Sequence, residues 1–374
     1  MATQEEIEKL KQEIEQTKRE IEQNKKGKGQ PEKSVDLKEE KPKLVKKSFP
    51  KKEGIDYSKP SLEVKRFTKR YKGSKIPAVE NVNFTVMPGE FHGFIGANGA
   101  GKTTTIKSLI GAYAKFEGSV EMFGHKHSTL EAKKHIGYIP ESAKFPKGMT
   151  TLSYITYMSY LSGMSMRDSK KYAKEKLIEL GLEKVMKRSP NTFSSGQKKK
   201  VLLAQALVHN PDIIIMDEPA ANLDPKARFE FFQDLKELQQ QGKSIFISSH
   251  ILAELDKFVD SLTIVDGGKI VFTGSMKNAT ENPELEYFIK GETEKDNKII
   301  IAVAEKLEIK YKPEDEGFIF FMIERKNIIK VMEYFAKAKI AIDTFKNRKM
   351  SLEEVYKKYV VLGSRETGVG KVGK

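Results

Sequence analysis

The feature that most constrains this sequence is a glycine-rich octapeptide at residues 96–103, GANGAGKT. It follows the apolar segment EFHGFIG, which we expect to form a buried strand, and it precedes a helix expected from about Gly101. Its glycines let the main chain curve around a phosphate without a Cβ in the way, and its N–H groups and the helix N-terminus direct positive partial charge toward that phosphate. The pattern G-x-x-x-x-G-K-[ST] between a strand and a helix therefore predicts a phosphate-binding loop.

Two side chains at the end of this loop have the chemistry to complete such a site. Lys102 is expected to reach the β- and γ-phosphates of a nucleotide, and Thr103 is expected to offer its hydroxyl to Mg²⁺. The loop residues predicted to contact the nucleotide are Gly96, Asn98, Gly99, Ala100, Gly101, Lys102, Thr103 and Thr104.

A second motif, IIIMDE at residues 213–218, ends an all-apolar strand with two acids. An all-apolar strand is typical of a sheet that is covered on both faces, and ligands of open α/β sheets bind at the carboxyl ends of the strands. Asp217 would hold Mg²⁺ and Glu218 would polarise an attacking water, whereas the alternative for two acids at a strand end is the start of a turn. The phosphate-binding loop upstream favours the metal and water roles.

A third motif, FSSGQ at residues 193–197, opens a helix expected over residues 198–209. Serine, glycine and main-chain N–H groups at a helix start can form another phosphate site, although the pentapeptide alone is more typical of an ordinary serine cap. Its position shortly before the Asp–Glu strand favours the phosphate site. The residues concerned are Ser194, Ser195, Gly196 and Gln197.

Taken in this order, the motifs resemble those of the nucleotide-binding subunits of the ATP-binding cassette (ABC) family. The order continues with ANLD, which ends at Asp224, and SSH, which ends at His250, and the resemblance covers about residues 60–275. It implies that ATP and Mg²⁺ are the cofactors, that Lys102, Glu218 and His250 are catalytic, and that Asp224 lies in the loop joining two ATPase sites. It also implies that the ring of Tyr71 stacks on adenine. Purely structural roles for His250 and Tyr71 are the alternatives.

Two positions depart from the family pattern. The family's signature reads Leu-Ser-Gly-Gly-Gln, and Phe193 and Ser195 replace its Leu and first Gly here. The family's Gln that senses Mg²⁺ and the membrane partner is replaced by Glu141, whose carboxylate can also ligate Mg²⁺. The residues expected at the metal are therefore Thr103, Asp217 and Glu141. Members that resemble drug and lipid exporters often carry Glu at this position, and this chain resembles that branch.

The alternation of strands and helices after Ser61 predicts an α/β fold with a parallel sheet. The resemblance implies a P-loop NTPase core of ABC type with an antiparallel β subdomain and a helical insert. After Gly274 the segments KIIIAV, GFIFFMI and AIDTF are expected to be strands, with helices near residues 328–338 and 352–361. The expected organisation is a short helix at 1–24, a disordered Lys-rich linker at 25–59, an ATPase domain at 60–275 with its insert at about 145–195, and an accessory α+β domain at 276–374.

The N-terminal segment carries apolar residues at heptad spacing, namely Ile7, Leu10, Ile14, Thr17 and Ile21. So short a stripe is marginal as a helix on its own. It predicts either a helix that pairs with a partner or a solvated charged helix.

Composition limits where the protein can work. The net charge of +15 is compatible with a nucleotide, a nucleic acid or an anionic membrane face as partner. The absence of Cys excludes disulfides, thiolate metal sites and a Cys nucleophile. No apolar run approaches the roughly 18 residues of a membrane helix, and the N-terminus has no apolar signal region. We therefore expect a soluble or peripheral intracellular protein. The resemblance to ABC subunits implies that it lies on the cytoplasmic face of the cell membrane.

The resemblance implies an ATPase that dimerises on ATP, as a homodimer or heterodimer, to drive a separate membrane-spanning subunit of an exporter. The Tyr- and Met-rich segment TTLSYITYMSYLSGMSM of the insert would either dock that subunit or pack the insert's own core. The alternatives are a soluble ABC ATPase acting on ribosomes or nucleic acid, and an ATP-binding regulatory module without turnover. No nucleic acid is expected, because neither a second cassette nor a long coiled-coil interruption is present.

Overall fold

The computed structural model describes residues 56–142, 144–280, 285–313, 319–323, 328–348 and 350–366. These residues divide into two compact units, a cassette unit made of residues up to 280 together with those from 350, and a small unit that lies between them in the chain. The predicted N-terminal helix and almost all of the predicted linker fall outside the described residues.

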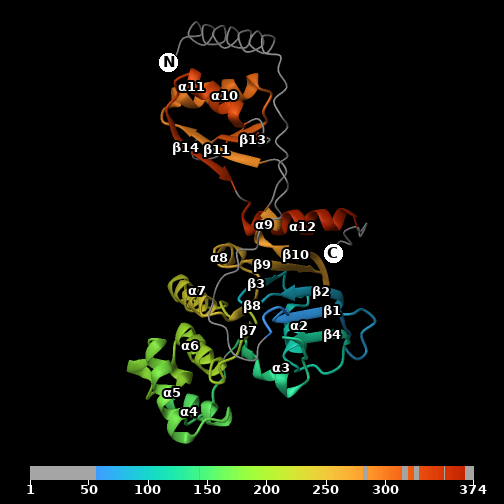
Figure 1. The fold of residues 1–374 in the computed structure, drawn as a ribbon, viewed down its shortest axis with the longest axis vertical. Helices are drawn as coiled ribbons and strands as arrows, with labels where there is room; N and C mark the ends of the chain where they lie inside the picture. The colour runs from blue at the N-terminus through green and yellow to red at the C-terminus, as the bar shows by residue number, and fades with distance from the viewer. Residues whose placement is uncertain are drawn as a thin grey trace. The chain divides into compact units, whose positions relative to one another are not determined.

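A six-stranded sheet forms the centre of the cassette unit (Figure 1). Its strand order is β10-β9-β3-β8-β7-β6, and all neighbours are parallel except β10, which pairs antiparallel with β9. Strands β3, β7 and β8 are buried along their whole length, which agrees with the all-apolar sequence of β7. The strands are β3 (Phe91–Ile95), β6 (Ile136–Ile139), β7 (Ile213–Met216), β8 (Ser244–Ser249), β9 (Ser261–Asp266) and β10 (Lys269–Ser275).

An antiparallel sheet covers one face of this central sheet. Its order is β2-β1-β4-β5, and the inward residues of β2 alternate with exposed ones, as expected for a half-buried strand. Its apolar side chains share a core with Phe94, Phe246 and the helix α2. The elements on this side are β1 (Leu62–Lys69), β2 (Val79–Val86), α2 (Lys102–Leu109), β4 (Glu117–Met122), β5 (His125–Lys126) and α3 (Leu130–Lys134).

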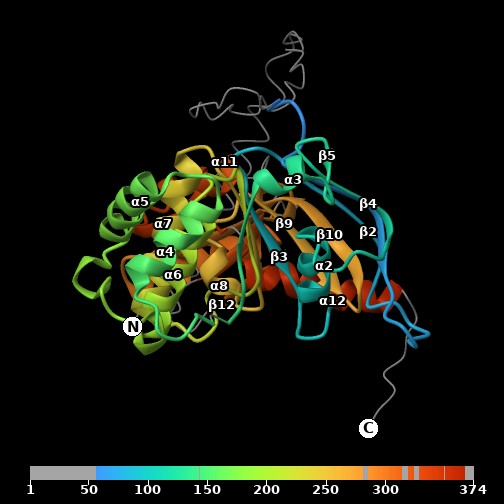
Figure 2. The same cartoon turned by 90° about the horizontal axis from the view of Figure 1, so that it is seen from below.

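Helices cover the opposite face, as Figure 2 shows for α4 to α7. The helix α4 contacts α5, and both contact α6. The helical insert consists of α4, α5 and two short 3₁₀ turns. Among the described residues, no helix is both long and apolar enough to cross a membrane. The elements are α4 (Thr151–Leu161), α5 (Met166–Glu179), η1 (Glu183–Val185), η2 (Pro190–Thr192), α6 (Ser195–Ala206), α7 (Pro225–Gln240), α8 (Leu252–Leu255) and α9 (Met276–Thr280).

The C-terminal helix α12 (Leu352–Glu366) belongs to the cassette unit. It contacts α8, α9, β9 and β10, and it is drawn in red next to β10 in Figures 1 and 2. Leu352 and Val355 are fully buried in the same core as the insert. This arrangement differs from the expected accessory domain at 276–374, because α9 and α12 both pack on the cassette.

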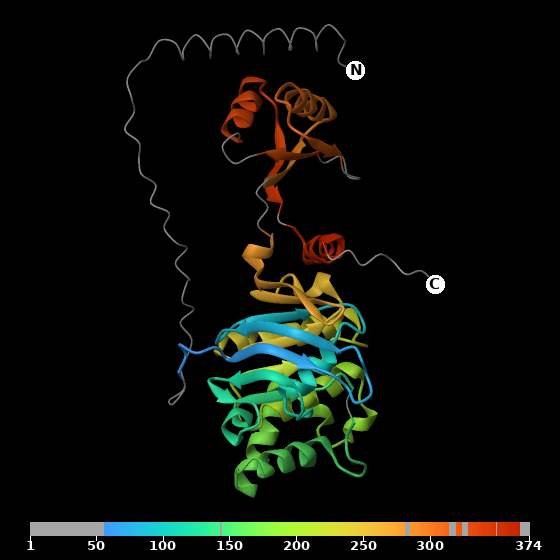
Figure 3. The same ribbon diagram turned by 90° about the vertical axis from the view of Figure 1, so that its right-hand side faces the viewer.

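The small unit is a four-stranded antiparallel sheet of order β12-β13-β11-β14 with α10 and α11 packed on it (Figure 3). Its core includes Ile289, Ile300, Val303, Val331 and Phe335. The elements are β11 (Leu285–Gly291), α10 (Glu294–Lys306), β12 (Tyr311–Pro313), β13 (Ile319–Ile323), α11 (Ile328–Lys337) and β14 (Ile342–Arg348).

The prediction of a strand for KIIIAV was wrong, because this segment lies inside α10. Thr293 caps the helix and forms a capping box with Asp296. Ile300, Val303 and Ala304 are buried at spacings of three and four, so one helical face satisfies the apolar run. A short run of Ile and Val is compatible with either structure until a partner surface is known. The α/β fold of the cassette, with its antiparallel subdomain and helical insert, is confirmed.

The burial of α12 predicts the cost of a cavity beneath it. We expect Leu352→Ala to lower the free energy of unfolding by about 2–5 kcal/mol, since a fully buried Leu is truncated. The control Leu161→Ala removes a side chain that is 74% exposed and should change it by less than about 0.5 kcal/mol. Denaturant unfolding of the full chain measures both, and equal midpoints would contradict the docking of α12.

Candidate functional site

The glycine-rich loop leaves β3 and enters α2 with a geometry that side chains would obstruct. Gly101, which precedes α2, has a φ of +101°, and a Cβ there would lie 2.6 Å from Val79 Cγ2 and 2.8 Å from the Ala78 carbonyl oxygen. A Cβ on Gly96 would lie 2.5 Å from the carbonyl oxygen of Val265 on β9. The glycines at these two positions are therefore required by close main-chain approach.

The Lys102 side chain is buried beneath this loop, with 5% of it exposed. Its Nζ donates to the carbonyl oxygens of Gly96 at 2.8 Å and Ala97 at 3.2 Å. It also lies 3.1 Å from Oε1 of Glu218. A buried ammonium is thus held by two carbonyl dipoles and one carboxylate, which offset the cost of removing it from water.

The two acids follow β7, and Ser248 of β8, the strand between β7 and β3, bonds to both of them. The Ser248 hydroxyl donates to Asp217 Oδ1 at 2.9 Å, and the same serine oxygen accepts from the Glu218 N–H at 2.9 Å. Thr103 Oγ1 donates to the same Asp217 oxygen at 3.2 Å. Glu218 has a φ of +43°, a left-handed conformation that is uncommon for a residue other than glycine.

The hydroxyl of Thr103 and the carboxylate of Asp217 suit a hard cation that prefers oxygen ligands. Among the residues that the structure describes, no cluster of three or more His, Asp or Glu side chains converges on a metal position. Mg²⁺ is commonly held by one or two protein oxygens together with water and substrate phosphates. When bound, Mg²⁺ would neutralise charge on the phosphates.

His250 completes a line of three charged or ionisable groups. Its Nδ1 lies 2.6 Å from Oε2 of Glu218, so the Glu218 carboxylate has Lys102 on one oxygen and His250 on the other. His250 is more exposed than Glu218, at 42% against 14% of the side chain. The carboxylate is oriented from both sides, while the imidazole faces the open part of the site.

These side chains surround a polar cavity of about 500 Å³, which we call the loop cavity. This volume lies within the range of small-molecule sites. Several predicted residues line it. Asp217 and Gly96 are not among the lining residues, but they bond to Thr103 and Lys102, which are. The lining residues are Ala78, Asn98, Gly99, Gly101, Lys102, Thr103, Thr104, Glu141, Glu218, Ala221, Asn222 and His250.

Glu141 is held at the cavity by a lysine from α6. Lys199 is buried, and its Nζ donates to the carbonyl oxygens of Pro140, at 3.0 Å, and of Glu141. Burial lowers the pKa of Lys199 to about 8, against the opposing effect of the Glu141 and Asp217 carboxylates. The sequence did not single out Lys199, because one lysine in a run of three carries no distinguishing pattern. Ser248 was noted only as the first residue of the SSH motif, without a role of its own.

The FSSGQ residues do not line the loop cavity of their own chain. Ser194 caps α6 by accepting from the Gln197 N–H at 3.3 Å, and the Gln197 side chain accepts from the Ser194 N–H at 3.2 Å. Ser194 and Ser195 are exposed. Asp224 likewise caps α7, accepting from the Ala227 N–H at 2.9 Å.

Tyr71 lies beside the loop helix and outside the cavity lining. Its hydroxyl is 3.0 Å from Thr104 Oγ1, and its ring meets that of Tyr113 edge-on at 5.9 Å between centroids. The ring is 41% exposed, so one part of it is accessible to a ligand that enters next to Thr104.

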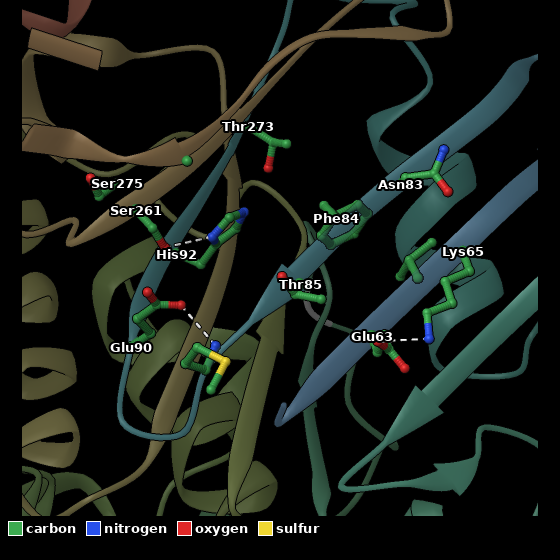
Figure 4. Close-up of a pocket in the computed structure, with 13 residues that line it drawn as sticks. Glu63, Lys65, Asn83, Phe84, Thr85, Glu90, His92, Ser261, Thr273 and Ser275 are labelled. Carbon is green, nitrogen blue, oxygen red and sulfur yellow. Dashed lines mark hydrogen bonds and ion pairs between the residues drawn. The ribbon is translucent and has the colours of Figure 1, made fainter. Parts of the chain in front are cut away.

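A second cavity, of about 450 Å³, lies between β2 and β10 (Figure 4). His92 at its base is buried, with Nδ1 2.7 Å from Ser261 Oγ and Nε2 3.0 Å from Thr263 Oγ1. Burial lowers the pKa of His92 to about 3, so the ring stays neutral. Glu90 accepts from the Met87 N–H at 2.8 Å. These polar groups are hydrogen-bonded within the protein and pack between the two sheets.

Comparisons with known proteins show what this chain resembles. A family model described as ABC transporter matches residues 79–221. The chain is 40% identical over 299 residues to an ABC transporter ATP-binding protein of Mycoplasma pneumoniae, covering 79% of this chain and 91% of that protein. It is 31% identical to Nod factor export ATP-binding protein I of Burkholderia lata, covering 57% and 70%. It also matches a dimeric ATP-binding cassette in a post-hydrolysis state with ADP and phosphate, at a TM-score of 0.52 and 29% identity over 57% and 98% of the two chains.

Gly101 of the loop can be compared with a second glycine of the same φ, so that the cost of backbone strain is measured separately from the cost of a steric clash. Gly163 also has a φ of +101°, but a Cβ there would meet nothing within 4 Å. We expect Gly163→Ala to cost about 1–2 kcal/mol of stability from the left-handed conformation alone. Gly101→Ala should cost more, because its Cβ must displace Val79 and the Ala78 carbonyl. Thermal unfolding without nucleotide compares them, and equal losses would contradict the steric account.

Proposed function

Because this chain belongs to the family of ABC transporter ATP-binding proteins, we propose that it binds and hydrolyses ATP to drive a separate membrane-spanning transport subunit. The observation that carries the proposal is the convergence of Lys102, Glu218 and His250 on one polar cavity beside the glycine-rich loop. The Thr103–Asp217 pair supplies the oxygen ligands for Mg²⁺ next to it.

The geometry supports a division of work among these residues. Phosphate oxygens in the cavity would compete with Glu218 for the Lys102 ammonium, which now lies 3.1 Å from that carboxylate. Glu218 would then be free to accept a proton from an attacking water. The His250 ring, which holds the other Glu218 oxygen, lines the same cavity and lies within reach of the terminal phosphate.

We further propose that ATP joins two cassettes, identical or different. Ser194 and Ser195 are exposed at the start of α6, and Asp224 is exposed at the start of α7, so they are available to a second molecule. The helix N-terminus and the serine hydroxyls provide donors for the phosphates of the opposing site. The solved cassette with ADP and phosphate that this chain resembles is a dimer, and this supports the proposal.

The exposed face of α4, in the helical insert, is the surface that we propose for the membrane partner. Tyr154 and Ile155 of α4 are buried in the core, while Tyr157, Tyr160 and Leu161 are exposed. One face of the Tyr-rich segment therefore packs inward, and the other face is accessible to a partner. Exposed aromatic and large apolar side chains are typical of interfaces. The Nod factor export relative supports the direction of transport, and such a partner would place this chain on the cytoplasmic face of the membrane.

The catalytic role of Glu218 is tested by Glu218→Gln. We expect ATP turnover to fall by roughly 10²- to 10⁴-fold, the usual contribution of a general base, while ATP affinity is retained. The matched control Glu117→Gln changes an exposed acid on β4 and should leave turnover unchanged. Steady-state ATPase assays with and without the membrane fraction measure this effect. Absence of turnover in the wild type even with its membrane partner would refute the enzymatic proposal.

The membrane partner is tested by fractionation of cells that express the full chain. We expect the wild type to sediment with membranes and Tyr157→Ser/Tyr160→Ser to shift to the soluble fraction, because the exposed face of α4 is lost. The control Ile178→Ser removes another exposed apolar side chain, which is 42% exposed and lies on α5. Co-sedimentation with ribosomes or DNA that weakens as salt rises would instead support the nucleic-acid alternative.

A further inference from the structure

The turn that follows β6 brings Glu141 to the loop cavity and is held through its main chain. The carbonyl oxygen of Ile139, the last residue of β6, accepts from the Asp217 N–H at 3.0 Å. The carbonyl oxygens of the next two residues, Pro140 and Glu141, both accept from the Nζ of Lys199, the first of them at 3.0 Å. Three successive carbonyl groups are therefore fixed, two of them by one ammonium.

Lys199 is buried and faces this turn. It lies in the second turn of α6, and only 4% of its surface is exposed. A lysine is rarely so buried unless its charge is compensated, and here two carbonyl dipoles compensate it. The next residue, Lys200, has a different environment, because its Nζ lies 3.6 Å from Glu230 and 3.8 Å from Asp234 on α7. Of the two lysines, Lys199 reaches a cavity residue and Lys200 reaches the neighbouring helix.

The other end of α6 is also fixed on β6. A Cβ on Gly137 of β6 would lie 2.8 Å from the carbonyl oxygen of Ala206, the last residue of α6, so the helix approaches the strand closely there. At the start of the helix, Lys199 meets the main chain just beyond the end of the strand. The helix and the strand are thus held together at two points, and a shift of α6 would displace the main chain of Glu141.

We propose that Lys199 is a positioning residue of the nucleotide site, because it fixes the main chain of Glu141 against α6 and so sets where the Glu141 carboxylate lies in the loop cavity. This inference rests on the proposed function, since it assumes that the cavity binds ATP and Mg²⁺. Lys199 acts through Glu141. Removing a group that orients a metal ligand commonly lowers metal affinity by roughly 10- to 100-fold.

The test compares two neighbouring lysines in the full-length protein. Lys199→Met removes the ammonium that holds the turn, and the matched control Lys200→Met removes the ammonium that faces α7. The Kd of a fluorescent ATP analogue is measured in EDTA and along a Mg²⁺ titration. We expect the Mg²⁺ concentration that gives half of the gain in affinity to rise about tenfold in Lys199→Met, while the Kd in EDTA stays within about twofold of the wild-type value. Lys200→Met should match the wild type in both measurements.

A second background shows whether Lys199 acts through Glu141. In a Glu141→Ala chain, adding Lys199→Met should change the Mg²⁺ dependence by less than about twofold, since the carboxylate that the lysine positions is already absent. An undiminished effect of Lys199→Met in that background would overturn the inference, because the lysine would then act by another route.

Hydrogen exchange without nucleotide provides a readout that depends neither on ATP nor on Mg²⁺. Peptides that span residues 136–142 should exchange faster in Lys199→Met than in Lys200→Met, while peptides from β8 exchange equally in both. If Lys199→Met does not fold, Lys199→Gln is measured in the same way with the same expected direction, since its side chain is uncharged and one atom shorter.

The outcomes separate this inference from the proposed function. Equal Mg²⁺ dependence or equal exchange of residues 136–142 in the two lysine variants would overturn the inference, although the proposed function would stand. The inference would also fail if the wild type bound the nucleotide equally well with and without Mg²⁺. A wild-type chain that does not bind the nucleotide at all would refute the proposed function, and this inference with it.

Discussion

The buried ammonium of Lys102 is the interaction on which the rest of the site depends. A charge this far from water must be compensated, and here the compensation comes from two carbonyls of the glycine-rich loop and from the Glu218 carboxylate. The same three contacts define the cavity, because they bring the end of β3 and the end of β7 together across β8. The position of the ammonium therefore sets both the loop geometry and the orientation of the acid.

The neighbouring strands explain how the remaining groups are placed. In the sheet, β8 lies between β3 and β7, so Ser248 bonds to both acids at the end of β7, and Thr103 reaches Asp217 from the far side. Glu218 has a left-handed conformation that costs free energy for a residue with a Cβ, and this strain is concentrated where His250 and Lys102 meet the carboxylate. Strain of this kind persists only where several contacts define the position, as they do here.

The candidate site groups most of the predicted residues around one cavity, but it leaves the FSSGQ segment outside that cavity. The loop cavity collects the groups that follow β3, β6, β7 and β8, whereas the FSSGQ segment caps its own helix and is exposed elsewhere on the surface. The helix α12 packs on β9 and β10, and β9 is the neighbour of β3, the strand from which the glycine-rich loop leaves. The nucleotide site thus depends on parts of the sequence that lie far apart.

The sequence by itself determined the features that depend on residues close together in the chain. The glycines at 96 and 101 are required by main-chain approach within a few ångströms, and the all-apolar strand before Asp217 reflects burial on both faces, so both could be predicted from type and spacing. Only the tertiary structure decided what depends on a partner surface. It decided that KIIIAV lies within α10, that α12 packs on the cassette, and that Ser248 and Lys199 bond to residues of the site. A hydrogen bond between residues dozens or hundreds of positions apart leaves no periodicity in the chain, and so only the folded arrangement of the strands and helices shows it.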